Sequence, residues 1–187
     1  MKKVLGKIVV TALSLVALSQ SANASGGAGF YAVPKAVVIM GDTIMHGAYE
    51  LDGDTGVGIG VDLGYAFTKN YAVELALTHV EADVTEDDLH GHVVKGDAEY
   101  TTYGVMGVYS RTITGHLRGL VKLGYAWEYE KITDVHHPFK TTLSGIAYAA
   151  GLEYGISDNM EVVFEYEGAE VVSSRGDSLM LGLKYKF

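Results

Sequence analysis

Apolar residues occupy every second position in eight segments of this 187-residue chain. The pattern is clearest at the carboxyl end, in the stretch DSLMLGLKYKF (residues 177–187). One face of that stretch carries Leu179, Leu181, Leu183, Tyr185 and Phe187. A period of two is that of a β-strand whose two faces meet different surroundings, and helical periodicity is absent. The sequence therefore predicts an all-β fold.

The connections between the eight predicted strands alternate in length. The strands cover residues 29–40, 56–67, 71–81, 98–110, 115–129, 142–155, 159–167 and 177–187. Tight turns are expected at residues 68–70, 111–114 and 157–159, and longer polar loops at residues 41–55, 83–97, 132–142 and 168–176. This rhythm predicts an eight-stranded antiparallel up-and-down transmembrane β-barrel with its short turns on the periplasmic side. The register of the fourth strand stays open, because YTTYGVMGVYS fits either face.

The composition of the second strand face favours a membrane over water. In residues 56–67 bulky side chains alternate with Gly58, Gly60, Asp62 and Gly64, and residues 145–151 alternate in the same way with Gly and Ala. Solvated strand faces favour larger polar residues, whereas the narrow interior of an eight-stranded barrel suits small ones. The bulky face is then the outer one, against lipid. A soluble barrel with its apolar face inside is the alternative.

Aromatic residues sort to the ends of the predicted strands. Rings with a polar handle gather where a membrane barrel meets the interface between lipid and water. The predicted girdles consist of Phe67, Tyr71, Tyr109 and Tyr154 on the periplasmic side, and of Trp127, Tyr129 and Tyr166 on the other. Ordinary core aromatics would not sort in this way, so the pattern supports the membrane interpretation.

Residues 1–24 are predicted to be a cleaved signal peptide, which leaves residues 25–187 as one barrel domain. Three lysines precede the apolar stretch IVVTALSLVAL, and Ala22-Asn23-Ala24 forms a cleavage site. The formal charge of −9 becomes −12 without the leader, because the leader holds three lysines and no acidic residue. So acidic a chain argues against a nucleic-acid partner. The absence of cysteine excludes disulfides and thiolate metal sites.

The leader, the eight alternating strands, YAVPKAVV (residues 31–38) and LMLGLKYKF (residues 179–187) resemble the small OmpA/OmpX-type outer-membrane β-barrel family. The resemblance spans the mature chain and implies the outer membrane of a Gram-negative bacterium, rich in lipopolysaccharide. It also implies contact with a barrel assembly machinery that reads a terminal strand ending in an aromatic, here Leu183, Tyr185 and Phe187. We expect a monomer without a cofactor.

The small face of the predicted barrel also carries charged residues. The predicted lumen network comprises Lys35, Asp62, Glu74, Arg118, Lys122, Glu153, Glu161, Glu165 and Lys184. Neighbouring strands suggest three ion pairs, Lys35 with Asp62, Arg118 with Glu153, and Glu161 with Lys184. Buried charges need partners, and eight strands leave an interior that side chains just fill. We therefore favour a structural plug, and a narrow porin-like ion channel is the alternative.

Five histidines fall in predicted loops on one side of the barrel, together with several carboxylates: His46, His90, His92, His136 and His137. Histidine with carboxylate suits zinc, or a charge switch near neutral pH. No tight spacing organises these residues, and DGDTG (residues 52–56) lacks the later glutamate of a calcium loop. Solvated loops are the simpler interpretation, and metal binding stays a weaker hypothesis.

The chain is not predicted to be an enzyme. Some barrels of this size modify lipid A with a serine and a histidine near the outer rim. Ser144 or Ser173 with His136 or His137 could supply that pair, but no short signature joins them. The leading hypothesis is a structural and surface-interaction role, in which acidic, histidine-containing loops face the surroundings.

Overall fold

The computed structural model describes residues 28–47, 49–87 and 92–187. Their regular structure consists of β1 (Gly29–Ile39), β2 (Thr43–His46), β3 (Tyr49–Gly53), β4 (Gly56–Ala66), β5 (Tyr71–Asp87), β6 (Val93–Thr114), β7 (Leu117–Thr133), β8 (Phe139–Gly155), β9 (Met160–Ala169) and β10 (Ser178–Lys186). The all-β prediction is confirmed. Among the described residues, no helix is long and apolar enough to cross a membrane. The predicted signal peptide lies outside the described residues.

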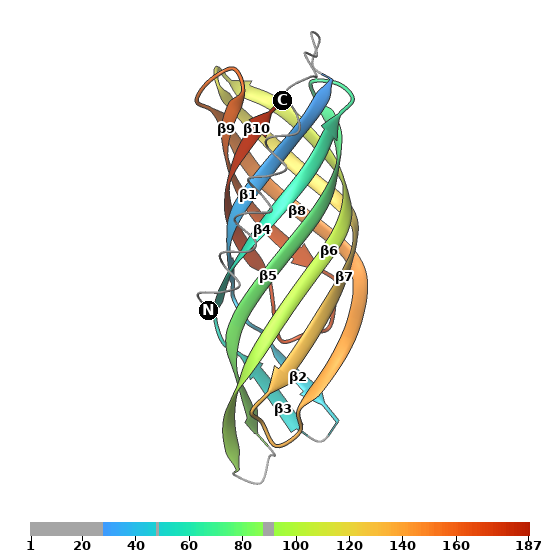
Figure 1. The fold of residues 1–187 in the computed structure, drawn as a ribbon, viewed down its shortest axis with the longest axis vertical. Coiled ribbons are helices and arrows are strands. Elements are labelled where there is room, and N and C mark those ends of the chain that lie inside the picture. The colour runs from blue at the N-terminus through green and yellow to red at the C-terminus, as the bar shows by residue number, and fades with distance from the viewer. Residues whose placement is uncertain (1–27, 48, 88–91) are drawn as a thin grey trace.

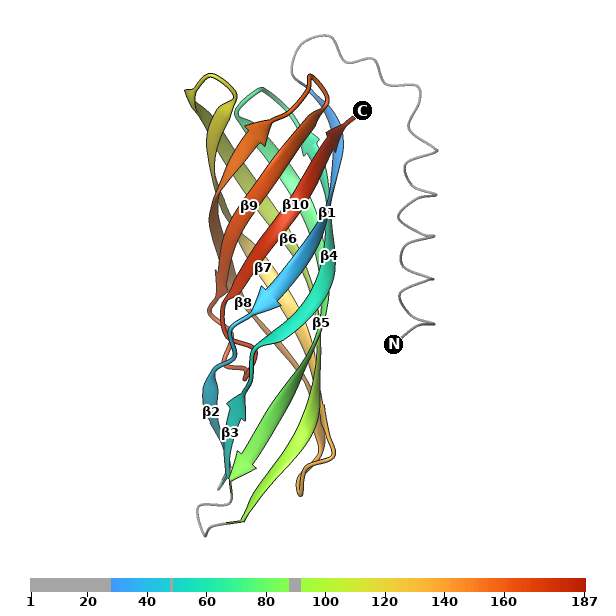
Figure 2. The same cartoon turned by 90° about the vertical axis from the view of Figure 1, so that its left-hand side faces the viewer.

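Eight of the ten strands close into an antiparallel barrel (Figure 1), as the sequence predicted. Every strand of this ring pairs with its neighbour in the order β1, β4, β5, β6, β7, β8, β9 and β10. The ring closes where β10 pairs with β1, for example Val37 opposite Met180 (Figure 2). The carboxyl-terminal strand is thus the seam of the barrel.

The two ends of the barrel differ in length. Residues 67–70, 115–116 and 156–159 make the turns at one end, which we call the short-turn end. At the opposite, long-strand end, β5 to β8 extend beyond the others, and β2 and β3 form a hairpin on the edge of β5 (Figure 1). Leu51 of this hairpin lies opposite Glu86. One side of the barrel wall therefore continues as an extended sheet.

The observed strand bounds correct four predictions. The predicted loop at residues 41–55 holds β2 and β3, and most described residues of the predicted loops 83–97 and 132–142 belong to strands. The predicted tight turn at 111–114 ends β6, and the turn follows at residues 115–116, where Gly115 has φ 48°. The polar composition of the three long segments suggested loops. They form strands instead, because each extended strand still has a hydrogen-bonded neighbour beyond the ring.

Even-numbered residues of β6 point inward, which resolves the open register of the fourth predicted strand. Tyr100 and Met106 are buried, whereas Tyr103, Val105 and Tyr109 are exposed on the outer face. The outer face of the ring is apolar on every strand, with exposed side chains such as Leu75, Leu123 and Leu181. In water such a surface would be a severe liability, so this face requires lipid.

The interior is filled in a graded way. Glycine makes room for large inward side chains: a Cβ on Gly64 would lie 2.1 Å from the ring of Tyr31. Towards the long-strand end the interior is apolar, where Val37, Ile39, Val80 and Met180 pack with Leu51 of the β2–β3 hairpin. The prediction of a small, charged interior therefore holds for the middle of the barrel and misses this apolar layer.

Candidate functional site

The centre of the lumen holds five interlocked charges. Lys122 Nζ lies 2.5 Å from Glu74, 2.6 Å from Glu165 and 2.8 Å from Asp62. Lys35 Nζ lies 2.5 Å from both Asp62 and Glu165. The five side chains come from β1, β4, β5, β7 and β9, and each is at most 3% exposed. Ion pairs between strands on different sides of the ring thus span the lumen.

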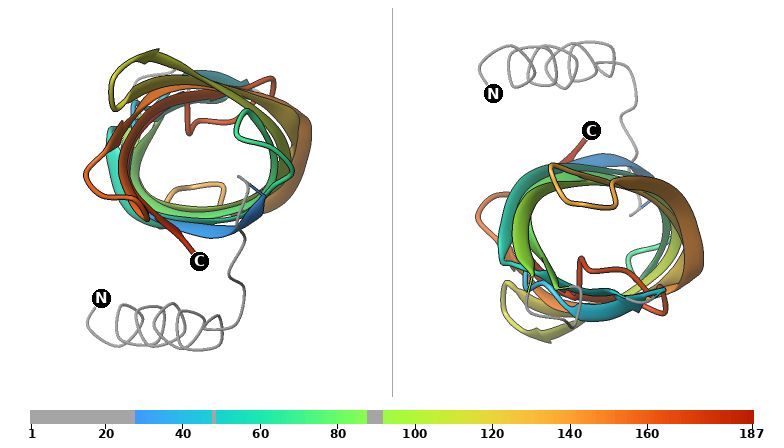
Figure 3. Two further views of the ribbon diagram at one scale, coloured as in Figure 1. Left: turned by 90° about the horizontal axis from the view of Figure 1, so that it is seen from above. Right: turned by 90° about the horizontal axis from the view of Figure 1, so that it is seen from below.

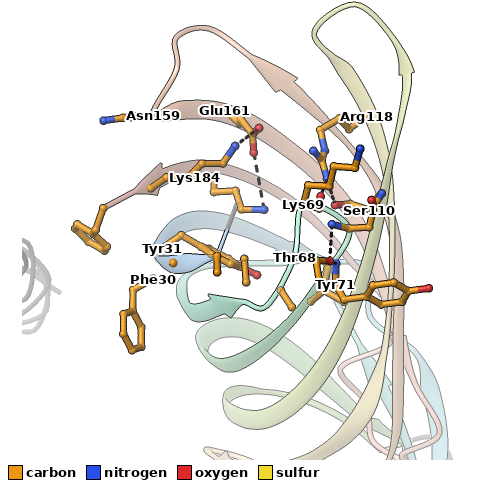
Figure 4. Close-up of a pocket in the computed structure, with 18 of the residues that line it drawn as sticks. Phe30, Tyr31, Thr68, Lys69, Tyr71, Ser110, Arg118, Asn159, Glu161 and Lys184 are labelled. Atoms are coloured by element: carbon orange, nitrogen blue, oxygen red, sulfur yellow. Dashed lines mark hydrogen bonds and ion pairs between the residues drawn. The ribbon is translucent and has the colours of Figure 1, made fainter. Parts of the chain in front are cut away.

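A second group of charges lines the short-turn mouth, around a cavity of about 270 Å³ (Figure 4). Arg118 Nε lies 3.3 Å from Glu153, and the Arg118 guanidinium also donates to Ser110 and to the carbonyl of Lys69. Lys184 lies 2.5 Å from Glu153 and 3.8 Å from Glu161. The cations at this mouth are therefore held by carboxylates of the wall.

The structure places all nine predicted lumen residues inside the barrel and brings the three predicted pairs together. Lys184, however, lies closer to Glu153 than to its predicted partner Glu161. Lys122, which had no predicted partner, contacts three carboxylates. Strand register predicts contacts only between adjacent strands, so it could not predict the ion pairs that cross the lumen.

A third polar layer comes from the segment between β9 and β10, which folds into the barrel at the long-strand end (Figure 3). Arg175 donates to Ser178 at 2.7 Å, and its guanidinium lies 3.5 Å from both Glu128 and Glu167. Ser174 donates to Glu130 at 2.8 Å, and its hydroxyl also bonds the hydroxyl of Tyr100.

The predicted solvated loop at residues 168–176 is therefore wrong in its middle, where residues 173–175 are buried. A polar composition predicts exposure, but here inward-facing glutamates supply partners for the segment. Glu128 and Glu130 share the inward parity of Lys122, and that signal could have found them. Nothing in the sequence pattern indicates that Arg175 turns inward.

Comparisons with known proteins agree with this geometry. The family model described as "Outer membrane protein beta-barrel domain" matches residues 8–187. The chain belongs to this family of outer-membrane β-barrels. The family implies a Gram-negative outer membrane, in which the short turns face the periplasm and the long strands the exterior.

Solved structures of small outer-membrane barrels are similar in fold. OprG from Pseudomonas aeruginosa has a TM-score of 0.66 at 12% identity, covering 87% of this chain and 98% of that chain. Neisserial surface protein A has a TM-score of 0.59 at 14% identity, covering 87% of this chain and 100% of that chain. Ail of Yersinia pestis, in complex with a heparin analogue, has a TM-score of 0.57 at 18% identity, with the same coverages. No curated protein sequence matches this chain.

The aromatic residues predicted to form girdles point outward from this outer-membrane barrel. The exposed fractions are 57% for Phe67, 58% for Tyr71 and 53% for Tyr154 at the periplasmic end, and 36% for Trp127 towards the exterior. Tyr109, Tyr129 and Tyr166 are also exposed. Some rings pack in pairs: Tyr71 lies at a tilt to Tyr109, and Tyr103 stacks on Trp127.

The residues predicted as an assembly signal lie at the seam of the outer-membrane barrel. Leu183 and Tyr185 face outward on β10. The backbone N–H of Phe187 donates to the carbonyl of Phe30 at 3.0 Å, which ties the terminal residue to β1. Recognition of this strand by an assembly machinery stays a prediction.

Two of the five histidines in the metal hypothesis converge on one carboxylate. Glu86 Oε1 lies 3.0 Å from His137 Nδ1 and 3.6 Å from His136 Nδ1, and Glu86 is 1% exposed. His137 also stacks on Tyr49 of the β2–β3 hairpin. Among the described residues, no group of three or more histidine and acidic side chains is placed to hold a metal ion. His90 lies outside these residues, so metal binding stays a prediction.

The serines considered for a lipid-modifying pair have partners other than the two histidines. The hydroxyl of Ser144 bonds Tyr125 at 3.0 Å, and Ser173 accepts the backbone N–H of Arg175 at 3.4 Å. His136 and His137 are instead engaged with Glu86. The outer-membrane barrel gives these residues structural contacts.

Like charges face one another on the outer surface of the extended sheet. Asp83 lies directly opposite Asp97 between β5 and β6, just beyond the end of the ring, and Glu81 lies opposite Glu99. The pKa of Asp97 is raised, first by desolvation and then by its hydrogen bond with Asp134 and by the charges of Asp83 and Glu81. Like charges directly opposite one another destabilise a sheet.

Proposed function

We propose that this protein is a closed outer-membrane barrel whose extended sheet serves as an acidic platform for surface interactions. The observation that carries the proposal is the run of opposed carboxylates on β5 and β6, with Glu81 opposite Glu99 at the end of the ring and Asp83 opposite Asp97 just beyond it. A chain selected for stability alone would avoid such pairs. Exposed sites that carry a stability cost are characteristic of binding surfaces. The partner expected from this chemistry is a basic surface.

The rigid support of the platform favours this role over that of a passive loop. The two strands stay in register from Tyr71 opposite Tyr109 to Asp87 opposite Val93. Asp134, beside Asp97, directly follows the last residue of β7 and has φ 62°. Glu99 has a cation nearby, Lys131 at 3.0 Å. Fixed carboxylates need no ordering upon binding, which lowers the cost of association.

The packing of the lumen supports a closed barrel over the channel alternative. Three polar layers and one apolar layer follow one another along the interior, and three deeply buried cations, Lys35, Lys122 and Arg175, lie among carboxylates. An eight-stranded barrel has an interior just wide enough for its side chains. We propose no catalytic role for these groups.

Binding of heptalysine to the protein in phosphatidylcholine nanodiscs tests the platform. We expect saturable binding that weakens at high salt, because exposed charges are screened. The Asp83→Asn/Asp97→Asn double variant should bind about fivefold more weakly, on the basis of about 0.5 kcal/mol for each exposed charge. As the pH is lowered, binding by the wild type should begin to weaken at a higher pH than it would with aspartates of ordinary pKa. The reason is that the raised pKa of Asp97 lets this carboxylate become neutral at a higher pH.

The matched control is Asp158→Asn, which removes one exposed carboxylate from the periplasmic turn between β8 and β9. It should leave the affinity for heptalysine unchanged. Equal affinities for the wild type and the platform variant, or an equal loss in the control, would contradict the platform.

A further inference from the structure

A second cavity, of about 280 Å³, lies at the extracellular mouth beside the inward-folded segment between β9 and β10. Its polar lining consists of Asp42, Glu128, Ser173, Arg175 and Asp177. Met40, Ala169 and Val171 form an apolar part of the wall. Met40 is 45% exposed, and Asp42 is exposed too, so the rim of the cavity reaches the surface.

Two deeply buried groups of the lining have atoms without a hydrogen-bond partner. Glu128 Oε1 and Arg175 Nε are both unpaired, although each residue is only 2% exposed. A buried polar atom without a partner destabilises the fold, because it has lost its contact with water. Glu128 lines the cavity, so its unpaired acceptor can be satisfied by a ligand that carries a donor, whereas a cationic ligand leaves the Arg175 Nε donor as it is.

The charge of the lining selects the ligand. The lining holds three carboxylates, those of Asp42, Glu128 and Asp177, and one guanidinium, that of Arg175. Arg175 is already shared, since its guanidinium lies 3.5 Å from both Glu128 and Glu167. A cavity with excess negative charge favours a cation and disfavours an anion.

The spread of the carboxylates favours an organic cation over a metal ion. Among the residues that the structure describes, no three histidine or acidic groups are close enough to hold a metal. An ammonium or guanidinium group can bind a single carboxylate, so it does not need several of them around one point. The apolar wall of Met40, Ala169 and Val171 suits a methylene chain that carries such a group.

We infer that this cavity binds a small organic cation that carries an ammonium or guanidinium group on a short methylene chain. Glu128 supplies the buried acceptor, and Asp42 lies at the exposed rim. The site is separate from the acidic platform, whose carboxylates lie on the outer face of β5 and β6, and does not depend on the proposed function.

Calorimetry of the full-length mature protein in phosphatidylcholine nanodiscs tests the inference with agmatine as the probe. Agmatine should bind saturably, whereas 1-pentanol and pentanoate, which have a similar chain but no positive charge, should not. Glu128→Gln should weaken binding about tenfold or more, because a charged hydrogen bond to a buried acceptor is lost. Asp42→Asn, at the rim, should weaken it about threefold.

Two controls keep the outcome decisive. Because Glu128 contacts Arg175, Glu128→Gln could fail to fold, and its binding result counts only if the variant folds. If it does not fold, Asp42→Asn and the comparison of the three probes decide. The platform variant Asp83→Asn/Asp97→Asn should bind agmatine like the wild type. Absent agmatine binding, equal binding of 1-pentanol, or undiminished binding by the cavity variants would overturn the inference. Loss of agmatine binding in the platform variant would overturn it as well, and would leave the platform standing.

Discussion

Replacement of Lys122 by methionine should lower the free energy of unfolding by about 3–5 kcal/mol, the cost of breaking a buried ion pair from one side. Lys122 Nζ lies within 2.8 Å of three carboxylates, those of Asp62, Glu74 and Glu165. Without it, Lys35 alone would face them. Methionine has a similar length, so the loss would arise from charge and not from a cavity. Urea unfolding in lipid vesicles, followed by tryptophan fluorescence, measures the change.

Two further variants separate the buried network from charge removal in general. Lys131→Met, also on β7, removes the partner of Glu99 at an exposed site, and should cost less than about 1 kcal/mol. The Lys122→Met/Glu74→Gln double variant should regain part of the lost stability, because it leaves one fewer unpaired carboxylate. Similar losses for Lys122→Met and Lys131→Met would contradict the central network.

Replacement of Leu123 by arginine should destabilise the protein in vesicles by about 2–4 kcal/mol, the cost of a charged residue near the middle of a bilayer. Leu123 is 65% exposed and lies in the middle of the outer face of β7, next to the Lys122 layer. On the surface of a soluble barrel the same change would be almost neutral. The stability loss therefore reports lipid against this face.

Ile113→Arg is the matched control, because Ile113 is 62% exposed and lies near the periplasmic end of β6. Its cost should fall to about 0–1 kcal/mol, as is usual near the membrane interface. The difference between the two variants is the informative quantity, since both add the same side chain. Equal costs at the two positions would be inconsistent with a membrane-spanning wall.

The ring was predictable because its two faces differ along every strand. Residues 56–67 alternate bulky side chains mostly with glycine, and residues 179–187 alternate them with Met180, Gly182, Lys184 and Lys186. Lipid on one side of the wall and a narrow lumen on the other impose this alternation along the whole strand. The inward charges followed from the same parity, and so did the adjacent pair Lys35 and Asp62.

The extracellular half was less predictable for physical reasons. Beyond the ring no lipid enforces an apolar outer face, so Asp83 and Asp97 look like loop residues although they lie in strands. Arg175 turns inward because Glu128 and Glu167 meet it from other strands. Such contacts depend on the closed ring, which brings together residues far apart in the chain.

Ion conductance across planar lipid bilayers tests the closed lumen most directly. The charge layers around Lys122 and Arg175 and the apolar layer around Ile39 predict no steady current above that of the bare bilayer. Reconstituted Lys122→Met provides the comparison, because it alters the middle of the lumen and leaves the outer face intact. A steady single-channel current in the wild type that changes in Lys122→Met would show a continuous path and contradict the closed barrel.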